Sequence, residues 1–208
     1  MGRATMPSLF VYTLTFDTGF APHVDREGRF LTLATCKPDL RRVAQKDDWI
    51  LGVGGVALKG KHYGEVIFLA KLTEPPMSFD GYHRDERFRG RLDNIYARRR
   101  GRLARVGRSG FHQSREEMEH DWKTDRVLVS AKFAYFGPRG PDLEIEGFTE
   151  FVRPIRRYLR RQLGRLEARL ILQAEDSWSP WNEWQAPSTP LEYCSPYVRT
   201  HGRSKPRT

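Results

Sequence analysis

The chain has 208 residues and a net charge of +10, a length typical of one domain with or without an extension. A hydrophobic fraction of 38% with 12% aromatic residues is enough for a packed core and excludes a fully disordered chain. No apolar run approaches the roughly 18–20 residues that span a bilayer, so we expect no membrane partner.

The first half of the chain reads as strands separated by turn residues. Alternating, β-branched and aromatic residues predict a strand over 8–16, and a short apolar piece follows at 32–35. Pro38 near its start favours a short helix over 37–44. Further strands are predicted over 49–55, which enters a glycine-rich bend, and over 65–72, which two prolines end.

The second half is more mixed. Residues 77–82 predict a turn or a single helical turn, and 84–115 lack periodicity, so we expect a long basic loop there. Another strand is predicted over 126–136. Apolar residues then recur at spacings of three and four over 152–170, which predicts a long amphipathic helix with its arginines off the apolar stripe. We expect one domain over 8–175 and a Trp/Pro-rich, basic extension over 176–208.

The start of the chain and its cysteines bear on the compartment. Met1 and Gly2 precede polar residues rather than the apolar core of a signal peptide. Cys36 and Cys194 do not make a disulfide framework, which fits a reducing environment. We therefore expect a cytoplasmic protein.

The positive charge is concentrated in three segments. Residues 84–115 hold eleven Arg against three acidic residues, 153–170 hold seven Arg against one, and 199–208 hold four basic residues and no acid. Segregated charge that is rich in Arg, whose planar guanidinium suits phosphate, predicts nucleic acid as a partner. A solvated basic surface is the alternative. The arginines expected to bind phosphate are Arg98, Arg99, Arg100, Arg102, Arg105, Arg156, Arg157 and Arg160.

Cys36 is the candidate nucleophile. It precedes Lys37 and Pro38 at the predicted start of a helix, and a helix N-terminus and a nearby cation both favour a thiolate in general. A small buried side chain is the commoner role of a free cysteine.

The sequence gives little support for a metal site or a cofactor site. Glu117 and His120 would share a face of a helix, but no second cluster supplies the three or four ligands that zinc needs. The glycines of 52–55 lack the lysine and serine of a phosphate loop. We therefore expect no metal and no cofactor.

Three ordered blocks of sequence resemble a known family, the second type of nucleotide-modification-associated domain. They are Thr15–Pro22, Leu31–Pro38 and Asp48–Gly52, and shorter similarities follow at Asp93–Tyr96, Val127–Ser130 and Tyr135–Gly137. The resemblance covers about residues 8–175 and implies a prokaryotic or phage system that alters DNA bases, with DNA a better expected partner than RNA and other proteins of that system as further partners. The family has Gly-Asp where this chain has Asp47–Asp48, and the stretch after Tyr96 is unusually rich in Arg.

A second similarity is to PUA-like domains such as ASCH and EVE, which are small curved β-barrels. It implies an α+β fold: a compact curved β-sheet or small β-barrel with flanking helices, one of them the long Arg-rich helix. This is an analogy of fold only.

We expect an aromatic-lined pocket that holds a nucleobase. Asp17, Trp49 and Asn94 should meet at its mouth, with Cys36, Asp17 and Asp48 as catalytic candidates. The residues expected to bind a base or nucleotide are Asp17, Thr18, Gly19, Phe20, Ala21, Pro22, Thr35, Cys36, Lys37, Pro38, Asp48, Trp49, Asn94 and Tyr96.

Three functions remain open. The first is a DNA-associated module that binds a modified or unmodified base. The second is an enzyme that acts on a nucleobase or nucleotide through Cys36 with Asp17 or Asp48. The third is an interaction subunit that presents its arginine helix and tryptophan tail to a modification enzyme.

Overall fold

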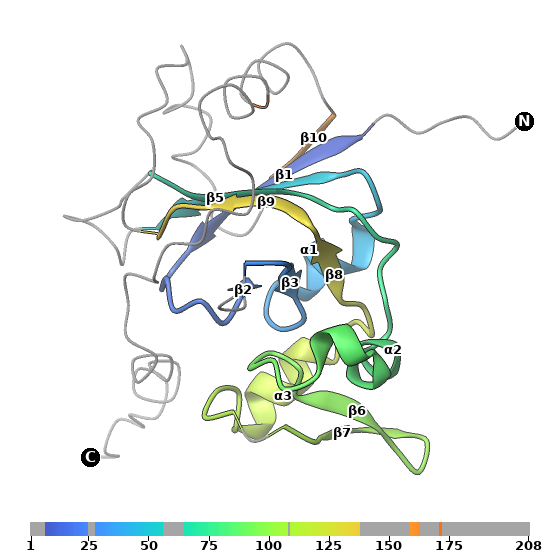
Figure 1. The fold of residues 1–208 in the computed structure, drawn as a ribbon. Helices are drawn as coiled ribbons and strands as arrows, with labels where there is room; N and C mark the ends of the chain where they lie inside the picture. The colour runs from blue at the N-terminus through green and yellow to red at the C-terminus, as the bar shows by residue number, and fades with distance from the viewer. Residues whose placement is uncertain are drawn as a thin grey trace, which may run out of the picture.

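The structure is a computed structural model that describes residues 7–24, 28–55, 65–107, 109–137, 159–162 and 171. It has the expected α+β character, with many short strands and few helices. The elements are stacked in layers, and the main sheet covers one side of the molecule (Figure 1).

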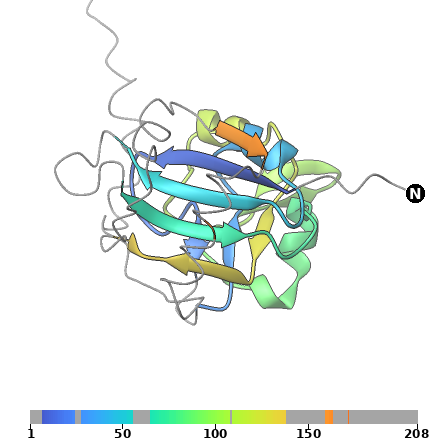
Figure 2. The same cartoon turned by 90° about the horizontal axis from the view of Figure 1, so that it is seen from above.

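The main sheet has five strands. Their order is β10 (Leu159–Gln162), β1 (Ser8–Leu14), β4 (Trp49–Gly54), β5 (Val66–Lys71) and β9 (Lys132–Tyr135). Figure 2 shows them side by side. β1 and β4 run parallel and the other neighbours antiparallel. Because β1 and β4 are buried almost throughout, they read as apolar runs rather than as strict alternation.

A smaller sheet lies beneath the main one and consists of β2 (His23–Val24), β3 (Leu31–Leu33) and β8 (Leu128–Ser130). The single strand predicted over 126–136 is therefore two strands, β8 and β9, which belong to different sheets. The chain changes sheets at Ala131, whose amide donates to Thr73 Oγ1.

The third sheet is a hairpin of β6 (Tyr96–Arg99) and β7 (Arg102–Arg105). It lies at the end of the molecule remote from the main sheet (Figure 1). The prediction of a long basic loop over 84–115 is thus wrong. Cross-strand hydrogen bonds and the packing of Tyr96 and Ala97 in the core order a segment that has no apolar periodicity of its own.

Three short helices connect the sheets. α1 (Pro38–Val43) begins with proline as expected, and α2 (Phe79–Arg84) with the 3₁₀ turn η2 (Glu86–Phe88) leads to the hairpin. α3 (Arg115–Asp121) begins with a capping box, in which Ser114 and Glu117 each satisfy the other's backbone amide.

The core has two parts. One lies between the main sheet and the small sheet and contains Phe10, Tyr12, Phe68 and Tyr135. The other joins the small sheet to α2, α3 and the hairpin and contains Val129 of β8, Phe79 and Tyr82 of α2 and Tyr96 of β6, with Met118 of α3 packed against it. α1 and α3, which carry the site described below, are fixed between these two parts.

Two predictions concern the long Arg-rich helix and the β-barrel. Leu159–Gln162 were expected in the long Arg-rich helix but form β10, because the edge of β1 offers unpaired backbone groups that a strand can satisfy. The rest of 152–170 and the extension over 176–208 lie outside the described residues. In the described part of the chain the sheets stay open, so the PUA-like barrel remains a prediction. No helix of that part is long and apolar enough to cross a membrane.

Candidate active site

Cys36 lies in the sharp turn between β3 and α1. Both Cys36 and Lys37 have positive φ, 55° and 42°, although neither is glycine. This left-handed conformation costs roughly 1–2 kcal/mol for each such residue, and it persists only where the surroundings enforce it. A strained turn between a strand and a helix is the setting in which other enzymes present a nucleophilic side chain.

Arg41 enforces the turn. Its side chain is fully buried, and its Nε donates to the carbonyl oxygen of Cys36 at 2.8 Å. Its other nitrogens donate to the carbonyl oxygens of Asp121 at 2.7 Å and Arg126 at 2.6 Å. The guanidinium thus joins the cysteine turn to the C-terminal end of α3.

Asp121 is the last residue of α3 and is fully buried. Its Oδ1 accepts the amide N–H of Cys36 at 2.6 Å, and its Oδ2 accepts the hydroxyl of Tyr96 at 2.8 Å. Its Oδ2 also lies 2.5 Å from Nδ1 of His112. These contacts fix the orientation of the carboxylate.

His112 comes from the loop between β7 and α3. Arg105 holds this loop, since its guanidinium donates to the carbonyl oxygens of Gly107, Ser109, Phe111 and His112. Phe20 supports it from the other side, stacked on Phe111 with 4.2 Å between ring centroids and 5.1 Å from the ring of His112.

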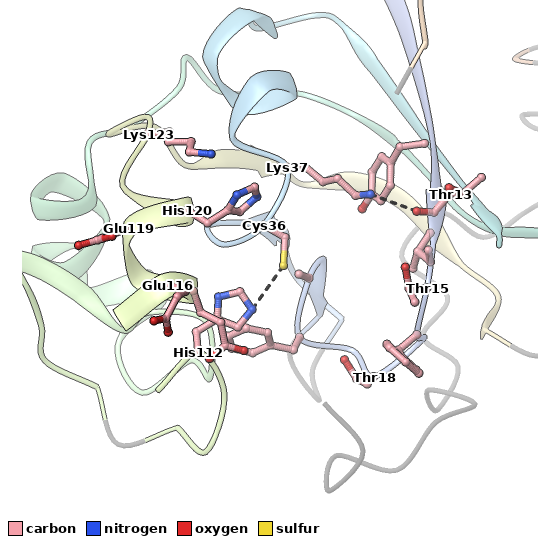
Figure 3. Close-up of a pocket in the computed structure, with 16 residues that line it drawn as sticks. Thr13, Thr15, Thr18, Cys36, Lys37, His112, Glu116, Glu119, His120 and Lys123 are labelled. Atoms are coloured by element: carbon pink, nitrogen blue, oxygen red, sulfur yellow. Dashed lines mark hydrogen bonds between the residues drawn. The ribbon is translucent and has the colours of Figure 1, made fainter. Parts of the chain in front are cut away.

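Cys36, His112 and Asp121 form a continuous chain of contacts. Nε2 of His112 lies 3.4 Å from Sγ of Cys36 (Figure 3). Its Nδ1 donates to Asp121. Burial would lower the pKa of His112, but the charge of the Cys36 sulfur and the hydrogen bond to Asp121 raise it to about 11. The imidazole is therefore protonated at neutral pH, and an imidazolium beside a sulfur stabilises a thiolate nucleophile.

A cavity of about 560 Å³ opens beside the sulfur. The end of β1 and the turn after it form one wall, with aromatic and hydroxyl side chains, and α3 forms the other (Figure 3). Its lining residues are Tyr12, Thr13, Leu14, Thr15, Phe16, Thr18, Phe20, Ala21, Cys36, Lys37, His112, Glu116, Glu117, Glu119, His120 and Lys123.

Charged side chains of both signs line the cavity, Lys37 and Lys123 among them. α3 brings three carboxylates, Glu116, Glu117 and Glu119, to the cavity. His120 beside them has a pKa lowered by burial, so its imidazole is neutral at pH 7. On the opposite wall Nζ of Lys37 donates to the carbonyl oxygen of Thr13 at 3.1 Å.

The same three residues could also hold a metal ion, because one ligand atom of each lies within 4.8 Å of the others. However, both oxygens of Asp121 already accept protein hydrogen bonds, and the imidazole uses one nitrogen for Asp121 and the other for Cys36. The arrangement fits proton transfer better than metal coordination.

Five of the expected base-binding residues line the cavity: Thr18, Phe20, Ala21, Cys36 and Lys37. Pro22, Thr35 and Pro38 are buried beside them, and Gly19 forms the turn with a positive φ of 67°. Tyr96 contributes indirectly, through its hydrogen bond to Asp121.

The expected mouth of Asp17, Trp49 and Asn94 is not formed. Asp17 is buried and accepts the hydroxyl of Tyr135, and the amide of Asn94 donates to the carbonyl oxygens of Tyr82 and Phe88. Trp49 pairs with Leu9 at the start of β1, whereas the cavity lies at the end of that strand.

Asp48 also has a structural role. It accepts the backbone amides of Ser8 at 2.7 Å and Gln45 at 2.8 Å and so ties the starts of β1 and β4 together. Because β1 and β4 are parallel, Asp48 lies at the end of the sheet away from Cys36.

The arginines that were expected to bind phosphate differ in whether they have a partner within the protein. Arg98 pairs with Asp125 at 2.9 Å, and Arg105 is committed to loop carbonyls. Arg99, Arg100 and Arg102 are exposed at the end of the hairpin. Arg160 lies in β10 opposite Phe10, and Arg156 and Arg157 lie outside the described residues.

The sequence did not single out His112, Asp121 or Arg41 as parts of a site. His112 and Asp121 lie 76 and 85 positions after Cys36 and share no local motif with it. One signal was available for α3, because Ser114 and Glu117 match the capping-box pattern, which predicts that a helix starts here.

Comparison with known proteins identifies the chain. Residues 6–179 match the family model described as nucleotide modification associated domain 2. No curated protein and no solved structure matches the chain. The family match spans most of the 208 residues and includes Cys36, His112 and Asp121, and the chain therefore belongs to the nucleotide modification associated domain 2 family.

Proposed function

We propose that this protein is a cysteine-dependent enzyme of a prokaryotic or phage DNA base-modification system, and that it acts on a nucleobase or on a group attached to one. The observation that carries the proposal is the chain of contacts from Sγ of Cys36 through His112 to Asp121 at the wall of the cavity. Family membership supports the nucleotide context.

The geometry supports covalent catalysis with acyl transfer as the reaction class. The thiolate of Cys36 attacks an acyl carbon, a sulfur–carbon bond forms, and the leaving group departs with a proton from the imidazolium of His112. An incoming water or amine then attacks the thioester, gives its proton to His112 and releases Cys36. Asp121 keeps the imidazole oriented throughout, as the third member of such triads does.

The donor that stabilises the oxyanion must come from elsewhere than the amide of Cys36, since that N–H already donates to Asp121. Lys37 lines the same cavity; burial lowers the pKa of its amine, and within the described residues only one of its donors is used, for the carbonyl oxygen of Thr13. Its side chain is therefore the group we assign to the negative charge that develops on the acyl oxygen.

The test uses p-nitrophenyl acetate, a general acyl donor. We expect a rapid burst of p-nitrophenolate equal to the amount of protein, with acetate attached to Cys36 in the intact mass spectrum. Cys36→Ser should abolish the burst, and His112→Gln should slow it by about 10²–10⁴, the range typical of a lost acid–base group. A burst that survives in Cys36→Ser would overturn the proposal, and loss of the burst with a chelator would favour a metal site.

A second candidate is a base-binding module without covalent chemistry. Tyr12, Phe16 and Phe20 line the cavity and offer the flat faces on which bases stack. Calorimetry with nucleosides distinguishes the two, because a binding module would bind equally well as wild type and as Cys36→Ser and would show no burst.

A further inference from the structure

The β6–β7 hairpin carries charge that its own fold does not use. Its ten residues, 96–105, include five arginines and no acidic residue. Arg98 and Arg105 have partners inside the protein, as described above. No partner within the described residues is found for the side chains of Arg99, Arg100 and Arg102, which are all exposed.

Two features of the hairpin make arginine an unfavourable residue at these three positions. Arg99 and Arg102 are directly opposite each other across the strands, and like charges in such pairs are destabilising. Arg100 and Gly101 form the turn with positive φ, 50° and 77°, as a type I′ turn requires, and asparagine rather than arginine is preferred at the first position. Local stability would therefore select other residues at all three sites.

We infer that the end of the β6–β7 hairpin is a contact surface for the phosphates of nucleic acid, with duplex DNA as the partner. The guanidinium fork matches phosphate oxygens, and three such groups at the end of a narrow hairpin can follow a phosphate backbone. A two-stranded ribbon is also one of the elements that the major groove of DNA admits.

Other anionic partners fit less well. Binding to a membrane surface normally requires apolar side chains to insert beside the basic ones. The hairpin offers none at its end, because Leu103 packs against the core cluster beneath it. The surface is also separate from the cavity beside Cys36, which no residue of 96–105 lines.

The test compares two variants of equal charge. In the hairpin variant Arg99→Thr, Arg100→Asn and Arg102→Thr are combined; these residues suit a strand or a left-handed turn, so the thermal midpoint should stay or rise. The control variant combines Arg42→Gln, Arg84→Gln and Arg89→Gln, which remove three exposed arginines that each pair with a nearby carboxylate.

Binding of a short fluorescein-labelled duplex DNA is measured by anisotropy over a range of salt concentrations. If the three arginines each neutralise one phosphate, the hairpin variant should flatten the slope of log K against log [salt] by about 2–3, near 0.9 for each contact. The control variant should keep most of the slope and affinity.

Three results would overturn the inference: absence of duplex binding by the wild type, equal losses in the two variants, or hairpin-dependent binding to phosphatidylserine vesicles without binding to DNA. The inference is independent of the chemistry of Cys36. The p-nitrophenyl acetate burst should therefore be unchanged in the hairpin variant, and each proposal can fail without the other.

Discussion

The imidazole of His112 is held between a sulfur and a carboxylate, and this determines its protonation. Its pKa of about 11 depends on the negative charge of Cys36 as well as on Asp121, in a site where burial alone would lower it. A protonated imidazole at neutral pH can donate to a leaving group at once, which is the role that acyl transfer requires first.

Replacing Cys36 by serine should lower the pKa of His112. A serine hydroxyl stays neutral, so the variant loses the charge that favours the imidazolium while burial still opposes it. Nuclear magnetic resonance of the imidazole should show His112 protonated through pH 8 in the wild type and titrating at lower pH in Cys36→Ser. An unchanged titration would mean that sulfur and imidazole do not interact electrostatically.

At the scale of elements, a single buried arginine fixes the turn that presents Cys36. Arg41 and Arg42 are neighbours in α1, but Arg41 is fully buried while Arg42 is exposed and pairs with Asp39. Only one of the two side chains can therefore matter for the relative position of α1 and α3.

Arg41→Met should lower the free energy of unfolding by about 3 kcal/mol or more, because each buried carbonyl left without a donor costs about 1–3 kcal/mol. Arg42→Met is the matched control and should change stability by less than about 0.5–1 kcal/mol, as exposed ion pairs do. Urea unfolding measures both. Similar losses in the two variants would show that Arg41 is not the link between the cysteine turn and α3.

Gly52 shows how an element can depend on the absence of a side chain. It lies in the middle of β4 opposite Phe68, and a Cβ there would be 2.1 Å from Cε1 of Phe68 and 2.7 Å from Cδ1 of Leu14. The glycine lets the aromatic ring lie against the strand, and the pairing of β4 with β5 shifts register directly after it, between Gly52 and Val53.

Gly52→Ala should therefore destabilise the protein by about 1–3 kcal/mol, the usual cost of overpacking a core. Gly110→Ala is the control, because a Cβ at Gly110 meets nothing within 4 Å. Thermal unfolding of the two variants distinguishes them, and equal midpoints would contradict the packing role.

At the scale of the whole molecule, charge of opposite sign is kept in separate places. The chain carries a net charge of +10, yet α3 brings three carboxylates to the cavity beside Cys36, while Arg99, Arg100 and Arg102 are exposed at the end of the hairpin. The cavity also holds Lys37, Lys123 and the imidazolium of His112, so the carboxylates make only its α3 side acidic.

This separation predicts how charged reagents reach Cys36. Glu116→Gln combined with Glu119→Gln should speed alkylation by iodoacetate, an anion, while the rate with neutral iodoacetamide stays nearly the same. Salt should reduce the difference, because exposed charges are screened within about 10 Å at 0.1 M. Mass spectrometry follows Cys36, with Cys194 as an internal reference. Equal effects on both reagents would point to altered structure instead of charge.

Several parts of this protein could be predicted from local sequence. The strands at β1, β4 and β5 follow from apolar and β-branched runs, and α1 follows from its proline. The sequence placed Cys36, the candidate nucleophile, beside a lysine and before a short helix, and the structure has that helix at Pro38–Val43. The hairpin and β10 were missed because pairing with distant backbone, not local pattern, orders them.

The sequence by itself determined which residues are present: the apolar residues of the core, the excess of arginine, the motifs of the family and the cysteine before α1. Only the tertiary structure decided which groups meet. It brought His112 and Asp121 to Cys36 through Arg41 and Arg105, and it placed Asp17, Asp48 and Asn94 in structural hydrogen bonds. The physical reason is that carboxylates and imidazoles have no local signature, so burial and available partners determine whether each one stabilises the fold or takes part in chemistry.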